Sequence, residues 1–493
     1  MNANHPIGQF KPYPAYRPSG VEWLGDVPEH WDVRRLKQVC SESALYGANV
    51  AATQYQAEGI RFLRTTDIAE DGRLFGEGVF LPAELVEEYV LSDGDILLSR
   101  SGTVGRSFLY AADLHGPCAY AGYLVRFVPN AATLPKYLFF FTKTEAFNAF
   151  LRVMAISSTI ENVNGEKYAN MPIPLPPPPE QRAIVRYLDY VDRRIRRYVD
   201  AKRRLIALLE EERQAVVDRA VTRGLDANVR LKPSGVGWLG DVPEHWEVRR
   251  LGYLATKFGS GITPRGGATV YQESGIPLLR SQNIHFDGLR MQDVARISPS
   301  LHEELAGTHV KPGDVLLNIT GASIGRTCSV PDDFAEGNVN QHVCIIRPSK
   351  TLLLPKLLAA YLSTPMMQRE IQVEQSGASR EGLTLQSIRS FRVIVPPPSE
   401  QRAIVEYLDR ATAEIDAAIA RARRQMELVE EYRTRLIADV VTGKLDVREA
   451  AAQLPDESDE HDPVEGVRQH QNGLAEAIYD AEEEPAIAEE VRT

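Results

Sequence analysis

The most constraining feature of this chain is a long passage that occurs twice. Residues 17–36 read RPSGVEWLGDVPEHWDVRRL and residues 232–251 read KPSGVGWLGDVPEHWEVRRL, so 17 of these 20 positions are identical. The segment EQRAIVRYLD at 180–189 also returns, as EQRAIVEYLD at 400–409. The distance between the copies far exceeds a solenoid unit, which indicates a tandem duplication of a domain plus a helix. The chain is therefore expected to perform one task twice.

The repeats divide the 493-residue chain into six segments. A chain of this length exceeds what one hydrophobic core supports, so several domains are expected. The order predicted from the repeats is a loose N-terminal arm at 1–16, a first domain at 17–176, a first long helix at 177–226, a second domain at 227–395, a second long helix at 396–446 and an acidic, disordered tail at 447–493.

The negative charge of the chain is concentrated in that tail. Residues 447–493 hold 14 Asp and Glu against 3 Arg, whereas the other 446 residues hold 53 acidic and 53 basic residues. A tail of this composition cannot bury enough apolar surface to fold. The acidic balance of the whole chain, −11, therefore says little against a nucleic-acid partner for the body.

The two long helices are predicted from heptad spacing. Apolar and amphipathic residues recur at steps of four and three over nearly five heptads, which is typical of a coiled coil. Prolines precede Glu180 and Glu400 at the helix starts, and Gly224 and Gly443 stand at the ends. We expect the two helices to pair antiparallel. The predicted seams are Ile184, Leu188, Val191, Ile195, Tyr198, Lys202, Leu205, Leu209, Glu212 and Val216, and Ile404, Leu408, Ala411, Ile415, Ala418, Ala422, Gln425, Val429, Tyr432 and Leu436.

Each of the two domains is predicted to be mixed α/β. Strand-like runs lie at 60–68, 94–106 and 118–129, and a helical stretch follows at 135–154. The second domain shows matching runs, but its loops differ: SRSGTVGR at 99–106 corresponds to NITGASIGR at 318–326. A common framework with different loops suggests two different targets read by one architecture.

Catalytic machinery is not expected in this chain. The sequence holds no GxxxxGK[ST] loop, no GxGxxG after a strand, no HExxH and no Asn-Pro-Pro-Tyr tetrapeptide. Structural roles are expected for His30, His245 and the tryptophans Trp23 and Trp31, because no nucleophile or metal ligand lies at a useful spacing. The four cysteines show no metal or disulfide spacing, and the N-terminus has no apolar signal core; both favour a cytoplasmic location.

The repeated motifs WLGDVPEHW[DE]VRRL and PPPxEQRAIV, each present twice, resemble the specificity subunit of type I restriction–modification systems. The resemblance covers residues 17–446. It implies an α+β fold with two mixed α/β target-recognition domains separated by two long antiparallel coiled-coil helices, as a pseudo-two-fold internal repeat. Residues 17–176 and 227–395 are then the recognition domains, and 177–226 and 396–446 the spacer helices.

The resemblance further implies that each domain reads one half of a bipartite double-stranded DNA site. Two methyltransferase subunits and two translocase–nuclease subunits would complete the complex, with S-adenosylmethionine, ATP and Mg²⁺ bound by those partners and no cofactor bound by this chain. The bases would be read by side chains that hydrogen-bond to groove edges. The candidates are Arg64, Thr65, Arg100, Ser101, Thr103, Arg106, Ser158 and Thr159 in the first domain, and Arg280, Gln282, Asn283, Asn318, Thr320, Ser323, Arg326, Ser379 and Arg380 in the second.

Two other readings stay open at the level of sequence. A scaffold without DNA, with two interaction domains on a coiled coil, fits the neutral charge of the body. A self-contained nuclease or methylase fits less well, because no cofactor motif is present. DNA binding by the chain, alone and with a methyltransferase subunit, would separate the first alternative from the specificity subunit.

Overall fold

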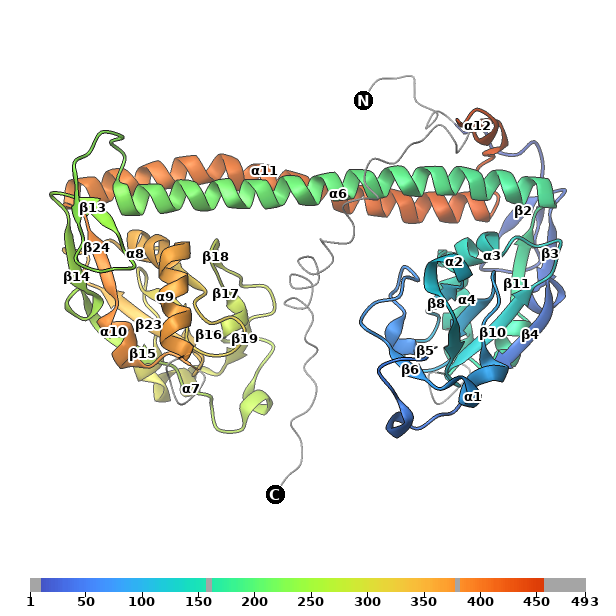
Figure 1. The fold of residues 1–493 in the computed structure, drawn as a ribbon, viewed down its shortest axis with the longest axis horizontal. Coiled ribbons are helices and arrows are strands. Elements are labelled where there is room, and N and C mark those ends of the chain that lie inside the picture. Colours follow the sequence, from blue (N-terminus) through green and yellow to red (C-terminus); the bar gives the residue numbers. More distant parts are fainter. Residues whose placement is uncertain (1–9, 157–161, 377–381, 456–493) are drawn as a thin grey trace. The chain divides into compact units, whose positions relative to one another are not determined.

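The computed structural model describes residues 10–156, 162–376 and 382–455, which form two compact units. Unit 1 combines the described residues up to 202 with residues 424–455, and unit 2 comprises the described residues from 203 to 423. Each unit contains one mixed α/β domain. Helix α6 (Pro178–Arg223) and helix α11 (Pro398–Val441) each contribute one part to unit 1 and the other to unit 2 (Figure 1).

The domain of unit 1 is built on two small sheets. An antiparallel sheet has the order β4-β10-β7-β8, and a mixed sheet has the order β6-β5-β9 with β5 and β9 parallel. The central strand β7 is apolar on both faces because Ile96 and Leu98 enter the main core while Leu97 enters a second core. The strands are β4 (Cys40–Tyr46), β5 (Ile60–Leu63), β6 (Val79–Leu81), β7 (Ile96–Ser99), β8 (Ser107–Leu109), β9 (Cys118–Tyr120) and β10 (Leu124–Pro129).

The domain of unit 2 repeats this topology. Its sheets have the orders β15-β23-β20-β21 and β19-β16-β22, and a two-stranded sheet β17-β18 is added. Strand β20 is again buried on both faces, with Val315 and Leu317 in one core and Leu316 in the other. The strands are β15 (Ala255–Ser260), β16 (Ile276–Leu279), β17 (Ile284–His285), β18 (Gly288–Leu289), β19 (Ala295–Ile297), β20 (Val315–Asn318), β21 (Thr327–Ser329), β22 (Asn338–Val339) and β23 (Val343–Pro348).

The single helical stretch predicted at 135–154 is wrong in one respect, because it consists of two helices. Helix α3 (Pro135–Phe141) ends at Thr142, and α4 (Glu145–Ile156) begins after Thr144. The Thr144 hydroxyl accepts a hydrogen bond from the Phe147 amide at 3.3 Å, which caps the second helix. Unit 2 shows the same break between α8 (Pro355–Leu362) and α9 (Pro365–Ser376).

A short strand pair ties each domain to its long helix. Strand β3 (Asp32–Arg35), from the repeated passage, pairs antiparallel with β11 (Pro172–Leu175), which leads into α6. In unit 2, β14 (Glu247–Arg250) pairs with β24 (Arg392–Val395) before α11. The two passages are nearly identical because both perform this same structural task.

The acidic residue at the start of each long helix organises the repeated passage. The Glu180 carboxylate accepts hydrogen bonds from Trp31 Nε1 at 3.0 Å and is bonded to His30 Nε2 at 2.9 Å. Glu400 holds Trp246 at 2.9 Å and His245 at 2.7 Å. These contacts give the two histidines the structural role that was expected of them.

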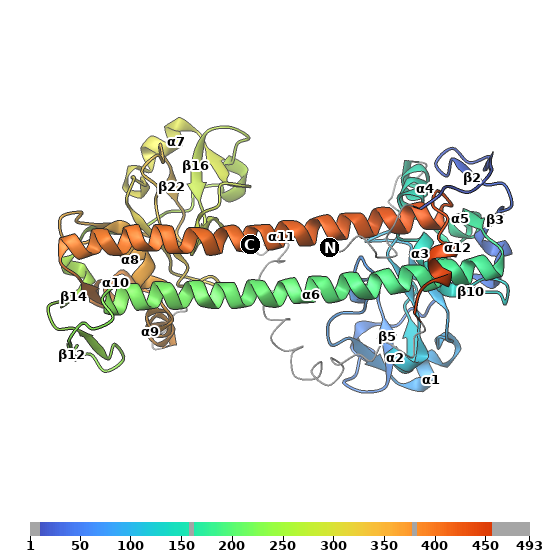
Figure 2. The same ribbon diagram turned by 90° about the horizontal axis from the view of Figure 1, so that it is seen from above.

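Helices α6 and α11 run antiparallel within each unit. In unit 1, Asp192 pairs with Arg433, and further along α6 Tyr198 reaches Gln425. In unit 2, Glu210 pairs with Arg423 and Arg213 with Asp416. From pair to pair, the residue number in α11 falls as the residue number in α6 rises, so the predicted antiparallel pairing is confirmed (Figure 2).

The predicted coiled-coil seam is confirmed only in the first part of α6, since near the other end the predicted Val216 is half-buried and its neighbour Val217 is the buried residue. Ile184, Leu188, Val191 and Ile195 are buried, but the next buried residue is Val199 and not Tyr198. Between Val199 and Val217 no α6 side chain is buried, and Leu205 is 40% exposed. A straight helix drifts from an exact 3.5-residue repeat, which accounts for the shift by one position.

No helix in the described ranges is long and apolar enough to cross a membrane.

Both long helices end before a glycine in the left-handed region, as predicted. Gly224 has φ +78° and Gly443 has φ +80°. A Cβ atom at Gly224 would lie 3.0 Å from Trp246 Cζ2, whereas one at Gly443 would lie 2.3 Å from Pro28 Cδ. Proline cannot swing away, so the clash at Gly443 is the more severe.

We therefore expect Gly443→Ala to destabilise unit 1 more than Gly224→Ala destabilises unit 2. Both variants pay about 1–2 kcal/mol for a left-handed alanine, and Gly443→Ala adds about 1–3 kcal/mol of overpacking against Pro28. Hydrogen exchange of the amides around each helix end measures the two losses separately. Equal losses at both positions would contradict the assigned clash.

The two ends of the described chain differ from the prediction. Residues 10–16 are not a loose arm, since Tyr13 is 3% exposed and its hydroxyl donates to Glu180 at 2.5 Å. Residues 447–455 are not disordered either: Val447 is fully buried and α12 (Arg448–Ala452) packs in the core of unit 1. Arg448 lies over the Tyr13 ring at 5.2 Å. Both segments are ordered because they pack against each other and against the core of unit 1.

Candidate nucleic-acid interface

Three loops at one end of the unit 1 sheets are tied together by hydrogen bonds. They are the turn after β5 (64–67), the β7–β8 connection (100–106) and the β9–β10 turn (121–123), here called the loop face of unit 1. The Ala121 amide donates to Leu63 O at 2.9 Å, and the Arg100 amide donates to Tyr123 O at 3.0 Å. The loops therefore form one continuous surface that the sheets hold in position.

Unit 2 has an equivalent loop face, formed by 280–283, 319–326 and 340–342. The Asn340 amide donates to Leu279 O at 3.0 Å, and the Ile319 amide donates to His342 O at 2.9 Å. These bonds match those of unit 1 one for one. The loop positions of the two units can therefore be compared residue by residue.

Two asparagines that were predicted to contact DNA are instead buried beneath the loops and support them. Asn318 is fully buried and its Nδ2 donates to Ser281 O and Ser323 Oγ, at 2.8 and 3.1 Å. Asn283 is 1% exposed; it accepts from the Arg280 amide and donates to Arg290 O. The prediction of base contact is wrong for these two asparagines, because burial leaves them no access to a ligand.

Two predicted arginines occupy equivalent positions but differ in charge balance. Arg64 lies over the Tyr55 ring and forms a bidentate pair with Asp67, at 3.0 and 2.7 Å. Arg280 lies over the Tyr271 ring, and in both cases the guanidinium carbon is 5.8 Å from the centre of the ring. Asn283 stands at the position of Asp67, so this position gives Arg280 no ion pair, and Arg280 Nη2 donates to Asp293 O at 3.2 Å. The hydrogen bond to Asp67 raises the pKa of Arg64, which keeps the guanidinium charged.

Arg100 is the arginine best placed to contact a ligand on the loop face of unit 1. Its guanidinium lies 5.1 Å from the centre of the Tyr46 ring, and its Nε is buried without a hydrogen-bond partner among the described residues. Stacking on an aromatic ring fixes the plane of a guanidinium. A guanidinium held in this way presents its two terminal nitrogens as a fork, which is the geometry that reads guanine O6 and N7.

The other predicted residues lie at or near the tips of the loops. Thr103 and Gln282 are exposed, while Thr65, Ser101, Thr320, Ser323 and Arg326 are half-buried. Thr320 is bonded to His342 Nδ1 at 2.5 Å. Arg106 is also half-buried, and its Nη1 donates to Ile68 O at 2.7 Å, so it fastens two loops together. Ser158, Thr159, Ser379 and Arg380 lie outside the described residues.

The β9–β10 turn is not among the features predicted from the sequence. The predicted strand-like run 118–129 is wrong as a single strand, because β9 and β10 belong to different sheets and the turn between them exposes 60% of Tyr123. In unit 2 the same turn presents Gln341 and His342. The Ala-Gly dipeptide at 121–122 was the available turn signal.

Burial keeps three titratable groups near the loop faces uncharged. Burial raises the pKa of Cys118 to about 11 and that of Cys328 to about 12, so both thiols stay protonated. Burial lowers the pKa of His285, which leaves that ring neutral at pH 7. In the part of the chain that the structure describes, no group of His, Cys, Asp and Glu is arranged to hold a metal ion.

Comparisons with known proteins identify the family. The family described as type I restriction modification DNA specificity domain matches residues 28–201 and 243–422. The EcoKI specificity subunit of Escherichia coli is 22% identical over 85% of this chain and 90% of its own length. The MjaIX specificity subunit of Methanocaldococcus jannaschii is 22% identical over 86% of this chain and 96% of its own.

A solved structure shares the fold. One chain from a study of complex assembly and conformational transition of the type I R-M system aligns with a TM-score of 0.60 and 19% identity, over 85% of this chain and 99% of that one. The two family matches fall on the two domains and extend into α6 and α11. This chain therefore belongs to the family of type I restriction–modification DNA specificity subunits.

Proposed function

We propose that the chain is the specificity subunit of a type I restriction–modification complex and that each unit reads one half of a bipartite double-stranded DNA sequence. The observation that carries the proposal is the pair of loop faces. Equivalent hydrogen bonds hold both loop faces, yet the side chains at matching positions differ. Arg100 of unit 1 corresponds to Ile319 of unit 2, and Tyr123 corresponds to His342. Constant support with variable contact residues is what two different half-sites require.

The chemistry is proposed to belong to partner subunits. Two methyltransferase subunits would modify adenine with S-adenosylmethionine, and two translocase–nuclease subunits would use ATP and Mg²⁺. In this complex the present chain supplies position and selectivity. Its residues Arg100, Arg280, Thr103 and Gln282 are proposed to contact groove edges, with Arg64, Thr65, Ser101, Thr320, Ser323 and Arg326 beside them.

The purified chain mixed with S-adenosylmethionine and duplex DNA is expected to transfer no methyl groups. Addition of the methyltransferase subunit encoded with it should produce methylation at one split sequence. Methylome sequencing of the product DNA identifies that sequence. Robust methylation by the isolated chain would overturn the assignment of chemistry to the partners.

Gel shift with the same duplex distinguishes DNA recognition from a scaffold role. Sequence-dependent retardation is expected when the methyltransferase subunit is present, because phosphate contacts alone give no sequence preference. A complex with the methyltransferase subunit that retards no duplex would favour the scaffold that does not bind DNA.

A further inference from the structure

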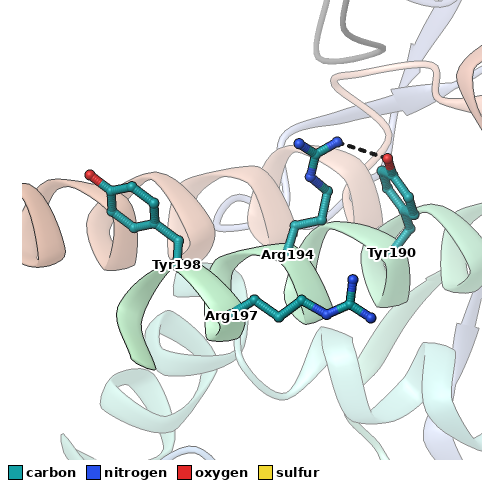
Figure 3. Close-up of a pocket in the computed structure, with 4 residues that line it drawn as sticks. All are labelled: Tyr190, Arg194, Arg197 and Tyr198. Atoms are coloured by element: carbon teal, nitrogen blue, oxygen red, sulfur yellow. Dashed lines mark hydrogen bonds between the residues drawn. The ribbon is translucent and has the colours of Figure 1, made fainter. Parts of the chain in front are cut away.

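The first half of helix α6 carries a basic and aromatic surface. Arg186, Tyr190, Arg194 and Arg197 follow at steps of four, four and three, which places them on one helix face. Tyr190, Arg194, Arg197 and Tyr198, together called the basic α6 face, surround a hollow of about 370 Å³ (Figure 3). Arg194 donates to the Tyr190 hydroxyl at 2.8 Å, so an aromatic ring supports the guanidinium.

This surface exists in only one of the two repeats. At the matching offset of 220 residues, α11 has Arg410, Glu414, Ala417 and Ala418. The cluster RRIRR at 193–197 corresponds to AEIDA at 413–417. A partner that binds both halves of a duplicated scaffold would need the same surface twice. The basic α6 face therefore suits something that is present once per chain.

The C-terminal tail is present once, and the described part of the chain ends beside this face. Arg186 donates to the carbonyls of Leu454 and Pro455, the last described residues, at 2.9 and 3.2 Å. Arg186 lies eight residues before Arg194, which is about 12 Å along the helix. The next seven residues, DESDEHD at 456–462, contain five acids. Seven extended residues span up to about 25 Å, so this segment is long enough to reach the whole basic α6 face.

We propose that the acidic segment 456–462 docks on the basic α6 face, with its carboxylates against Arg194 and Arg197. The fork of an arginine matches a carboxylate, and the short tether makes the local concentration of the segment high. Each exposed ion pair is weak alone, so the docking depends on several pairs together. The docked segment neutralises the single-copy basic surface and keeps DNA phosphates from occupying it.

The test is a photo-crosslink in the full chain, with p-benzoylphenylalanine in place of Tyr198. This probe keeps an aromatic ring at the rim of the hollow. We expect an adduct with the peptide that contains 456–462, and we expect its yield to fall when salt is raised from about 0.05 M to about 0.5 M. The matched control places the same probe at Ala418 of α11, where no adduct with the tail is expected.

A second variant tests the charge. Amide substitutions D456N, E457Q, D459N, E460Q and D462N should remove most of the adduct from position 198, and they leave every described residue unchanged. The proposal is overturned by an equal yield from this variant or from position 418. It is also overturned if mixed light and isotope-labelled chains show adducts only between different copies, or if added DNA is the sole crosslinked partner.

Discussion

Replacement of residues 37–171 with the equivalent segment of another specificity subunit should change one half of the methylated sequence and leave the other half unaltered. The segment contains the entire loop face of unit 1, including Arg100. Strands β3 and β11 lie just outside it and keep their pairing with each other. If the new half-site differs at three base pairs, at about 1–3 kcal/mol each, methylation of the original site should fall by more than about 100-fold. Methylome sequencing reads both halves in one experiment.

The donor segment must preserve the contacts that cross its ends. Tyr137 donates to Pro174 O at 2.7 Å and to Val441 O at 3.1 Å, and the Leu134 amide donates to Gln181 at 2.8 Å. A donor with tyrosine at the position of Tyr137 keeps the domain seated on the long helices. The matched experiment exchanges residues 252–391 and should alter only the other half. A change in both halves from either exchange would contradict independent reading by the two units.

A single substitution gives a finer version of the same test. Arg100→Ala should reduce methylation by about 10–100-fold and relax the sequence at one position, since it removes one bidentate base contact. Arg152→Ala is the control, because Arg152 is exposed, pairs with Glu145 within α4 and is not one of the loop-face residues. Equal effects of the two substitutions would argue against base contact by Arg100.

Glu180→Ala should destabilise unit 1 by about 3–5 kcal/mol, whereas Glu400→Ala should destabilise unit 2 by about 1–2 kcal/mol. The Glu180 side chain is 5% exposed and accepts from Tyr13 and Trp31, both of which are buried. Burial and the hydrogen bond to Glu180 raise the pKa of the Tyr13 phenol well above its ordinary value. The phenol therefore stays protonated as a donor, and removal of its acceptor leaves it unsatisfied.

Glu400 is the matched control for Glu180. It occupies the same position in the repeat and bonds to Trp246 and His245, but its side chain is 40% exposed. Water can replace most of what this carboxylate supplies. Hydrogen exchange of amides in the first turns of α6 and α11 reports the two units separately, which a single melting temperature of a multidomain chain does not. Similar losses in both units would show that Tyr13 adds nothing to the site.

Much of the architecture follows from sequence alone. The duplicated passage reveals two equivalent units, because near-identity over 20 positions needs a shared structural task. The long helices follow from their spacing, their acidic starts and the glycines Gly224 and Gly443, since these are local effects of backbone geometry and helix ends. Local rules also predicted the strand-like runs that contain β7 and β20.

Only the tertiary structure separated the proposed contact residues from the supporting ones. Asn318 and Arg100 look alike in a sequence, as polar residues in variable loops. Asn318 is buried and donates to Ser281 O, 37 residues away, while Arg100 lies over the Tyr46 ring with its Nε unpaired among the described residues. Tyr13 and Glu180 meet across 167 residues, and this contact turned an apparent arm into part of the core. Burial and hydrogen-bond partners depend on which distant segments meet, and the local pattern of residues does not contain that information.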